Sequence, residues 1–422
     1  MELSPFKKNL SWIFFGNIVH AILQFALNVY CARQFGADDY GVLNYSGSLI
    51  AFFIAIGSLG FGGVITKFYA DDEKNAGKYI FTSILSRLLL ALLSIAALQV
   101  IIGFDEACTS QLRLIVFCQS LQMLFVVLDM FVHWFRYKHQ AKAVTILRLL
   151  SFAISAVWRF IAIMNHNLVW YTLGVSVEAF FFLIFLIILY RKEYRQLAFK
   201  FDWGSLQSML KLSYPFIFSA LLSTIYAQTD KVMLKNMVDY ASVGIYSVSQ
   251  TLAGAIVIIP VALIEGFRPE IMVAKTKDER EYSRLFRQLY GIIFWLCISY
   301  CLFITLFAEP IVRIIYGPSY IEAVASLSVI VWYTSFSYFG AVNHMYMVAE
   351  EKTFWVQVVT LSGALLNVGL NFLLIPRWSI LGAAWASLIT QFVANYVLLW
   401  VIKPLRPCFS ILNRGIAFRW RR

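Results

Sequence analysis

Charged side chains are scarce in this chain. They make up 14% of its 422 residues, whereas hydrophobic residues make up 60%, and the mean hydropathy is +0.73. Soluble domains carry about 25% charged residues. The shortage therefore excludes a chain built mainly from soluble domains.

Cysteine is also rare, with six residues that lack zinc-type pairing. Cys297 and Cys301 are spaced i, i+4, which is typical of packing on one helix face. The sequence thus predicts no metal site, no cofactor and no structural disulfide. A small-residue cleavage site is missing after the first apolar run, so we expect this run to remain as the first span.

Long apolar runs occupy most of the chain. Because a helix rises 1.5 Å per residue, about 20 apolar residues cross a bilayer. Twelve runs are long enough, and they predict an all-α integral membrane protein. We place these spans at 12–31, 42–66, 79–103, 112–135, 143–163, 168–190, 211–233, 242–265, 285–308, 323–348, 354–375 and 380–402.

The basic residues indicate the orientation of the spans. Of the 35 Lys and Arg residues, 26 fall on the side of the N-terminus, six on the opposite side, and three, Arg87, Arg148 and Arg159, within spans. Because positive loops stay in the cytoplasm, we expect a multi-pass plasma membrane protein with both termini cytoplasmic. The net charge of +12 is then a signal of topology and does not indicate a nucleic-acid partner. The outer loops are too short for a catalytic domain, which argues against an enzyme.

A polar segment at 191–210 divides the chain almost in half. We predict an N-lobe at 1–190 with spans 1–6, a cytoplasmic linker at 191–210, and a C-lobe at 211–402 with spans 7–12. A basic cytoplasmic tail at 403–422 follows. Six spans in each half would give two halves of parallel topology, which is one architecture of alternating-access transporters.

Short motifs carry a resemblance to a known family. They are ARQFGADDYG at 32–41, DKVML at 230–234, VGIYSVS at 243–249, NFLLIP at 371–376 and ILGAAWASL at 380–388. Together with twelve spans, they resemble the Wzx-type O-antigen and polysaccharide flippases of the multidrug/oligosaccharidyl-lipid/polysaccharide (MOP) exporter superfamily.

The resemblance implies a two-lobed, V-shaped bundle that works by alternating access. Such proteins move undecaprenyl-pyrophosphate-linked oligosaccharide units across the bacterial plasma membrane, for O-antigen, capsule or exopolysaccharide synthesis. The implied partners are this lipid-linked oligosaccharide, membrane lipids, and the polymerase and chain-length proteins of the pathway. Lipid II flippases of the superfamily carry an Arg-Asp pair where this chain has Leu27 and Asn28. A peptidoglycan precursor is therefore not the expected substrate.

Charged groups within spans are the first candidates for a functional site. A charge inside the bilayer costs about 2.5–3.5 kcal/mol, so it usually faces a polar interior. Arg87, Arg148 and Arg159 are basic, and Glu178 lies near the middle of span 6. One interpretation is a basic cavity wall that binds pyrophosphate. The other is that Glu178 pairs with Arg87 or Arg159 and holds helices together, while Arg148 contacts lipid headgroups.

Polar side chains extend the candidate set. Asn17, Gln24 and Asn28 share one face of span 1, where they either hydrogen-bond between helices or line a cavity. The further candidates for substrate binding are Tyr226 and Gln228, and those for ion coupling or gating are Glu178, Asp129, Asp230 and Lys231. Asp230 and Lys231 form either an outer salt-bridge latch or a substrate contact. Coupling to a proton or to sodium is left open.

Two other functions fit part of this pattern. A cation-coupled multidrug exporter of the same superfamily would share the fold, but it would favour an acidic cavity, and the excess charge within the spans is basic. A membrane glycan polymerase would need a sizeable outer loop with catalytic groups. The sequence therefore favours the flippase.

Overall fold

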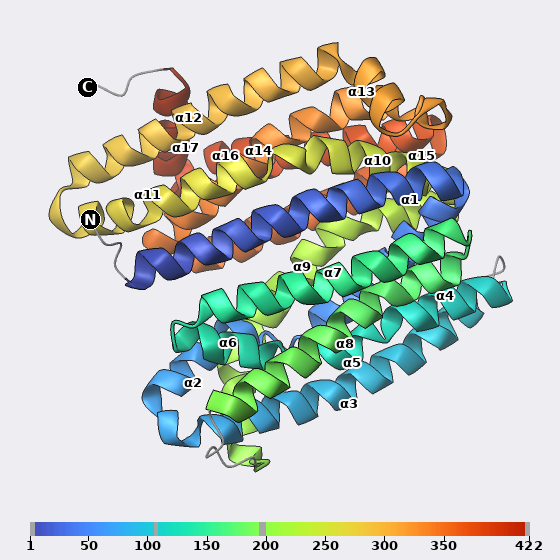
Figure 1. The fold of residues 1–422 in the computed structure, drawn as a ribbon. Coiled ribbons are helices and arrows are strands. Elements are labelled where there is room, and N and C mark those ends of the chain that lie inside the picture. The colour runs from blue at the N-terminus through green and yellow to red at the C-terminus, as the bar shows by residue number, and fades with distance from the viewer. Residues whose placement is uncertain (1–4, 105–108, 194–199, 418–422) are drawn as a thin grey trace. The chain divides into compact units, whose positions relative to one another are not determined.

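The protein is built from helices throughout the part that the computed structural model describes, residues 5–104, 109–193 and 200–417 (Figure 1). The elements up to the middle of the chain are α1 (Pro5–Gly57), η1 (Phe61–Gly63), α2 (Ile65–Asp71), η2 (Glu73–Asn75), α3 (Ala76–Gly103), α4 (Ser110–Ser120), α5 (Gln122–Val126), α6 (Asp129–Tyr137), α7 (Ala141–Met164), α8 (Leu168–Glu193) and α9 (Trp203–Met237).

The remaining elements complete the second half. They are α10 (Tyr240–Ala253), η3 (Gly254–Ile256), α11 (Ile258–Lys277), α12 (Glu279–Leu306), α13 (Ala308–Ile315), η4 (Pro318–Tyr320), α14 (Ala323–Ala349), α15 (Thr353–Phe392), the π-helical turn η5 (Val393–Val397), α16 (Leu398–Val401), η6 (Lys403–Leu405) and α17 (Arg406–Ile416). The predicted all-α architecture is confirmed.

Ten helical stretches in the described residues are long and apolar enough to cross a membrane, and two of them contain a reversal of the chain. In α15, Ser379 has a non-helical backbone with φ of 48°. A Cβ added at Gly382 would lie 2.3 Å from the carbonyl oxygen of Leu374. These residues would be about 12 Å apart in a continuous helix. α15 is therefore a hairpin that contains the two predicted spans at 354–375 and 380–402.

The other reversal is in α1, at Gly36, where φ is 81°. Before it, α1 follows α7, with Gly16 against Thr145 near one end of α7 and Tyr30 stacked on Phe160 toward the other. After it, Gly47 lies against Gln119 of α4, and the Gly57 carbonyl accepts a hydrogen bond from Arg87 of α3. The two reversals turn the ten stretches into twelve segments, in the order that the sequence predicts.

Two compact units divide the chain, an N-unit at Met1–Thr224 and a C-unit at Ile225–Arg422. The division lies inside α9, beyond the linker predicted at 191–210. Residues 194–199 of that linker lie outside the described residues, and 203–210 already belong to α9. The helix begins early because Asp202 caps it, accepting a hydrogen bond of 2.6 Å from the Ser205 backbone amide.

Asp202 also ties the start of α9 to α3. Its carboxylate lies 3.1 Å from Lys78 Nζ, and its backbone amide donates to Thr82 Oγ1. Hydrogen bonds from Ser205, and then from Lys78, lower the pKa of Asp202 to about 2. The cap therefore stays ionised at any physiological pH.

The predicted basic tail at 403–422 contains a packed helix. Within α17, Cys408 and Leu412 are fully buried, and they belong to the apolar core of the C-unit. Burial raises the pKa of the Cys408 thiol to about 12. The spacing of these residues gives α17 one apolar face, which packs on α12, while Arg406 and Arg414 remain exposed. Residues 418–422 lie outside the described residues.

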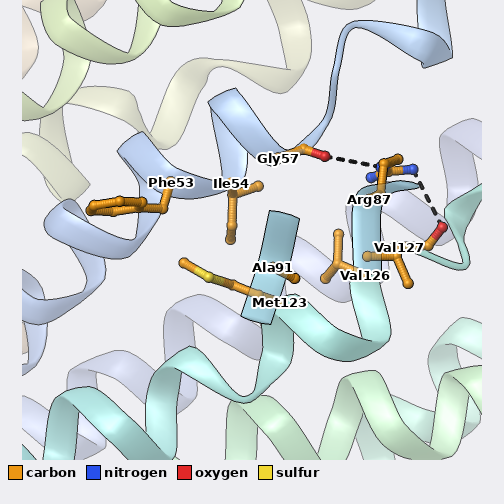
Figure 2. A pocket seen from close by; sticks show the side chains of 8 residues that line it. All are labelled: Phe53, Ile54, Gly57, Arg87, Ala91, Met123, Val126 and Val127. Atoms are coloured by element: carbon orange, nitrogen blue, oxygen red, sulfur yellow. Dashed lines mark hydrogen bonds between the residues drawn. The ribbon is translucent and has the colours of Figure 1, made fainter. Parts of the chain in front are cut away.

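Arg87 of α3 links three segments of the N-unit, as Figure 2 shows in part. Its side chain is 3% exposed and donates to the carbonyl oxygens of Gly57, at the end of α1, and of Val127, between α5 and α6. The guanidinium also pairs with Asp129, with a shortest distance of 2.5 Å. The carbonyls left free where two helices end therefore obtain their donor from Arg87.

This arrangement predicts that Arg87→Ala destabilises the protein. Removing one partner of a buried ion pair costs about 3–5 kcal/mol. We expect about 2–3 kcal/mol here, because the Asp129 side chain is 40% exposed and can still be hydrated. The measurement is the unfolding temperature of the purified protein in detergent, followed by tryptophan fluorescence.

Arg313→Ala is the matched control, because Arg313 forms an exposed i, i+4 pair with Glu309 and its loss is expected to change stability by less than about 0.5 kcal/mol. Equal unfolding temperatures for the two variants would contradict the proposed packing role of Arg87.

Candidate functional site

A polar cavity of about 340 Å³ lies within the N-unit, among α1, α5, α7 and α8. Most of its polar wall comes from residues inside predicted spans. The lining residues are His20, Gln24, Gln122, Val126, Arg148, Ser151, Arg159, Val175, Glu178, Ala179 and Phe182. Four residues that the sequence predicts for a site, Gln24, Arg148, Arg159 and Glu178, are thereby brought together.

Arg159 is the buried basic residue in the wall of this cavity. Its guanidinium donates to Glu178 Oε2 at 2.9 Å and to Gln24 Oε1 at 3.1 Å. Only 2% of the residue is exposed, and its stem lies on Gly174, where an added Cβ would be 2.3 Å from Arg159 Cγ. Within the described residues, Arg159 Nε has no hydrogen-bond partner. The residue is thus fixed in place and keeps one unused donor.

His20 completes a three-residue cluster with Arg159 and Glu178. Its Nε2 lies 3.2 Å from Glu178 Oε1, and its ring packs edge-on against Phe152. Glu178 therefore contacts two groups that can carry positive charge. Our sequence reasoning missed His20. The signal was present, because His20 lies between Asn17 and Gln24 on the same polar stripe of span 1.

Arg148 is the cation of the cavity that lacks a carboxylate partner. Its side chain is exposed and lies over the Phe182 ring, 5.6 Å from the ring centre. No acidic group lies within salt-bridge distance of it among the residues that the structure describes. With Arg159 offset by Glu178, the wall carries one net positive charge when His20 is neutral. Such a wall can bind an anion.

The other predicted N-unit residues lie elsewhere. Asn17 lines a separate cavity of about 20 Å³ beside Arg136 and Arg148, and Asn28 accepts a hydrogen bond of 2.8 Å from Gln24. Arg87 and Asp129 form the helix contact described above. Of the two interpretations for Glu178, the pairing with Arg159 is present in the structure. It occurs in the cavity wall, so the two interpretations are compatible.

A second polar cluster surrounds Asp230 in the C-unit. The carboxylate is 1% exposed and accepts three hydrogen bonds of 2.6 Å, from Tyr246, Asn371 and Ser387. These donors come from α10 and from both arms of the α15 hairpin. All three donors are uncharged, and the charged group nearest along the chain is Lys231, which interacts electrostatically with Asp230.

The Asp230 cluster has spare hydrogen-bonding capacity. Asn371 Nδ2 also donates to Asn367 Oδ1 at 3.1 Å. Within the described residues, Asn371 Oδ1 and Asn367 Nδ2 are buried and have no partner. A carboxylate with a free amide oxygen beside it can accept a proton or coordinate a small cation.

The neighbours of Asp230 along α9 are Lys231, Tyr226 and Gln228. Lys231 interacts electrostatically with Asp230, and no salt bridge or hydrogen bond joins the two side chains among the described residues. The roles of Asp230 and Lys231 as a latch or a substrate contact stay predictions. Tyr226 packs its ring against Gly363, and its hydroxyl is buried without a partner among the described residues. Gln228 is half-buried.

Four of the five sequence motifs each contribute one residue to this cluster. Asp230 opens DKVML, and its donors are Tyr246 of VGIYSVS, Asn371 of NFLLIP and Ser387 of ILGAAWASL. The sequence analysis named Asp230 and missed its three donors. Each donor lies in a motif that carries the same family resemblance as the motif of Asp230, and this was the signal from which the donors could have been predicted.

Comparison with known proteins agrees with this architecture. A family model described as polysaccharide biosynthesis protein matches residues 6–265. A capsular polysaccharide biosynthesis protein, CapF of Staphylococcus aureus, is 23% identical over 401 residues, which cover 92% of this chain and 96% of CapF.

Solved structures of two transporter types are similar in fold. The lipid II flippase MurJ, in an inward closed conformation, matches with a TM-score of 0.74 at 14% identity, over 96% of this chain and 91% of MurJ. An inward-facing multidrug resistance MATE family transporter of the MOP superfamily matches with a TM-score of 0.72 at 13% identity, over 94% and 96% of the two chains. The chain is therefore a multi-pass membrane protein of the polysaccharide biosynthesis protein family, with the fold of MOP superfamily transporters.

Proposed function

We propose that this protein is a flippase for polyprenyl-pyrophosphate-linked oligosaccharides. The observation that carries the proposal is the N-unit cavity, whose wall holds two arginines against one carboxylate inside membrane-spanning helices. Membership of the polysaccharide biosynthesis family supports a glycan as cargo, and the MurJ-like fold supports a lipid-linked one.

The chemistry of the substrate explains this composition. A lipid-linked oligosaccharide carries an anionic pyrophosphate that must leave water while its lipid tail stays in hydrocarbon. Because a cation within the membrane costs about 2.5–3.5 kcal/mol, the arginine charge that Glu178 does not offset favours an anion in the cavity. Arg148 supplies the unpaired cation for a phosphate, and Gln122 offers its amide group to a sugar.

The setting of this activity is the bacterial plasma membrane, with alternating access of the cavity to its two sides. Cytoplasmic termini are part of the proposal, supported by the 26 basic residues on one side of the predicted spans. The polymerase and chain-length proteins of the same pathway would act on the translocated unit.

Ion coupling is assigned to Asp230 in this proposal. Glu178 contacts Arg159 and His20, and Asp129 contacts Arg87, so both of these carboxylates already have basic partners. Asp230 has uncharged donors and a neighbouring free amide oxygen. Binding of a proton or a sodium ion there would neutralise a buried charge, which makes its occupancy sensitive to an ion gradient.

Multidrug export is the second candidate, and the similarity to MATE transporters favours it. Drugs moved by cation-coupled exporters are commonly cationic, and the N-unit cavity has an excess of positive charge. Charge therefore favours the flippase over the exporter.

Deletion of the gene tests the function directly. We expect complete polyprenyl-linked repeat units to accumulate while the surface polymer is lost, because units made in the inner leaflet cannot reach the polymerase. The measurement is mass spectrometry of extracted polyprenyl-linked sugars beside a surface-glycan gel. Units that reach the outer leaflet and remain unpolymerised would indicate a polymerase. Unchanged lipid-linked sugars together with increased drug sensitivity would indicate an exporter.

Replacement of Arg148 tests the anion site. Loss of a charge-assisted hydrogen bond weakens binding by about 1.5–3 kcal/mol. Arg148→Gln is therefore expected to lower surface polymer at least about tenfold in the complemented deletion strain, at unchanged protein level. Arg191→Gln, which removes an exposed arginine near the end of α8, is the matched control. Normal export by Arg148→Gln would remove this residue from the site.

Replacement of Asp230 tests coupling. Asp230→Asn keeps the size of the side chain, removes the charge and replaces one accepting oxygen with a donor, which the free Oδ1 of Asn371 can accept. We expect gradient-driven translocation in proteoliposomes to fall at least about tenfold and to lose its response to an imposed proton or sodium gradient. Asp239→Asn is the control, because Asp239 caps α10 and asparagine caps equally well. An Asp230→Asn protein with an unchanged unfolding temperature and a normal gradient response would contradict the assignment.

A further inference from the structure

His20 is the one histidine among the residues that line the cavity in the described part of the chain, and a histidine ring can take up a proton. The charged groups that face it are Arg148 and Arg159 of α7 and Glu178 of α8. Its other neighbours are uncharged, namely Gln24 of its own helix, Gln122 of α5 and Phe152 of α7. Farther away, Arg136 lies beside Arg148 in the small neighbouring cavity, and Asp129 is paired with Arg87.

The net charge of the arginines and the glutamate in the cavity does not balance the charge of the substrate that we propose for it. Arg148 and Arg159 against Glu178 leave a single positive charge. A pyrophosphate esterified at both ends, to a polyprenol and to a sugar, is a dianion. One negative charge would remain uncompensated in a site within the membrane, where unpaired charge is costly.

We propose that His20 takes up one proton when the pyrophosphate-linked substrate binds, so that the loaded cavity is electrically neutral. The inference rests on the flippase function proposed above. His20 is placed for this role because its Nε2 already lies 3.2 Å from Glu178 Oε1 and its ring is held against Phe152. Protonation turns this hydrogen bond into an ion pair and leaves both ring nitrogens as donors.

The proton also changes how Arg159 is used. In the structure, Glu178 is shared between Arg159 and His20. A protonated His20 offsets the charge of Glu178 by itself, which leaves the guanidinium of Arg159 more of its positive charge for the phosphate. His20 is therefore a positioning and charge-matching residue, and Arg148 and Arg159 are the groups that contact the anion.

Calorimetry measures this proton directly. The full-length protein in lipid nanodiscs is titrated with a synthetic farnesyl diphosphate ester of N-acetylglucosamine, a dianion that does not titrate near neutral pH. Titrations in two buffers with different ionisation enthalpies give the number of protons taken up per ligand bound. We expect this number to approach one for the wild-type protein at a pH somewhat above neutral. The wild-type Kd is expected to rise by up to about tenfold per pH unit in that range.

Two substitutions separate the proton from the fold. His20→Gln is expected to bind more weakly, without proton uptake and with a flat pH profile. His20→Lys carries a permanent cation, and we expect it to bind tightly, again with a flat profile. His344→Gln, which replaces an exposed histidine on α14 of the C-unit, is the matched control and should behave as wild type.

The outcomes distinguish this inference from the function on which it rests. Binding by the wild type without proton uptake, or equal uptake by wild type and His20→Gln, would overturn the role of His20 and leave the flippase function standing. Absence of wild-type binding to the diphosphate ester, with drugs bound instead, would contradict the flippase function itself.

Discussion

The cost of an unsatisfied polar group in hydrocarbon is the constraint on which this structure depends. At several breaks in the helices of the N-unit, a side chain donates to a backbone carbonyl. Arg87 donates to the carbonyls freed at Gly57 and Val127, and Ser176 donates to the Cys118 carbonyl. The same constraint explains why the N-unit cavity remains polar, because Glu178 holds Arg159 there and Gly174 leaves the space for it.

Much of the fold could be predicted from the sequence because hydrophobic length is a local property. Twelve apolar runs predicted twelve segments, even though two pairs appear as the continuous helices α1 and α15. The position of the division between the two units was harder to predict from the sequence. Polarity at 191–210 suggested a linker, whereas the Asp202 cap starts α9 early and the contacts of α9 place its first part in the N-unit. Contacts of this kind depend on tertiary packing, which composition does not encode.

The site was predictable in its residue types and less so in its partners. Arg148, Arg159, Glu178 and Gln24 were recognisable because charge and amide groups within spans are rare, and they share a cavity. Arg87 satisfied the same criterion and instead joins helices, because its depth in α3 places it beside the breaks next to Gly57 and Val127. His20, Tyr246, Asn371 and Ser387 were missed because their importance comes from the carboxylate that each contacts.

The order in which the chain is synthesised leaves Asp230 without most of its hydrogen-bond donors for a time. Ribosomes synthesise α9 before its partners, and Tyr246 follows Asp230 by 16 residues, whereas Asn371 follows by 141 and Ser387 by 157. During that interval the carboxylate has one of its three native donors. An ionised acid exposed to lipid is unstable by a few kcal/mol, so Asp230 adds a local free-energy cost to the nascent chain until these donors are made. Synthesis of the α15 hairpin supplies Asn371 and Ser387, which complete the set of donors to the carboxylate.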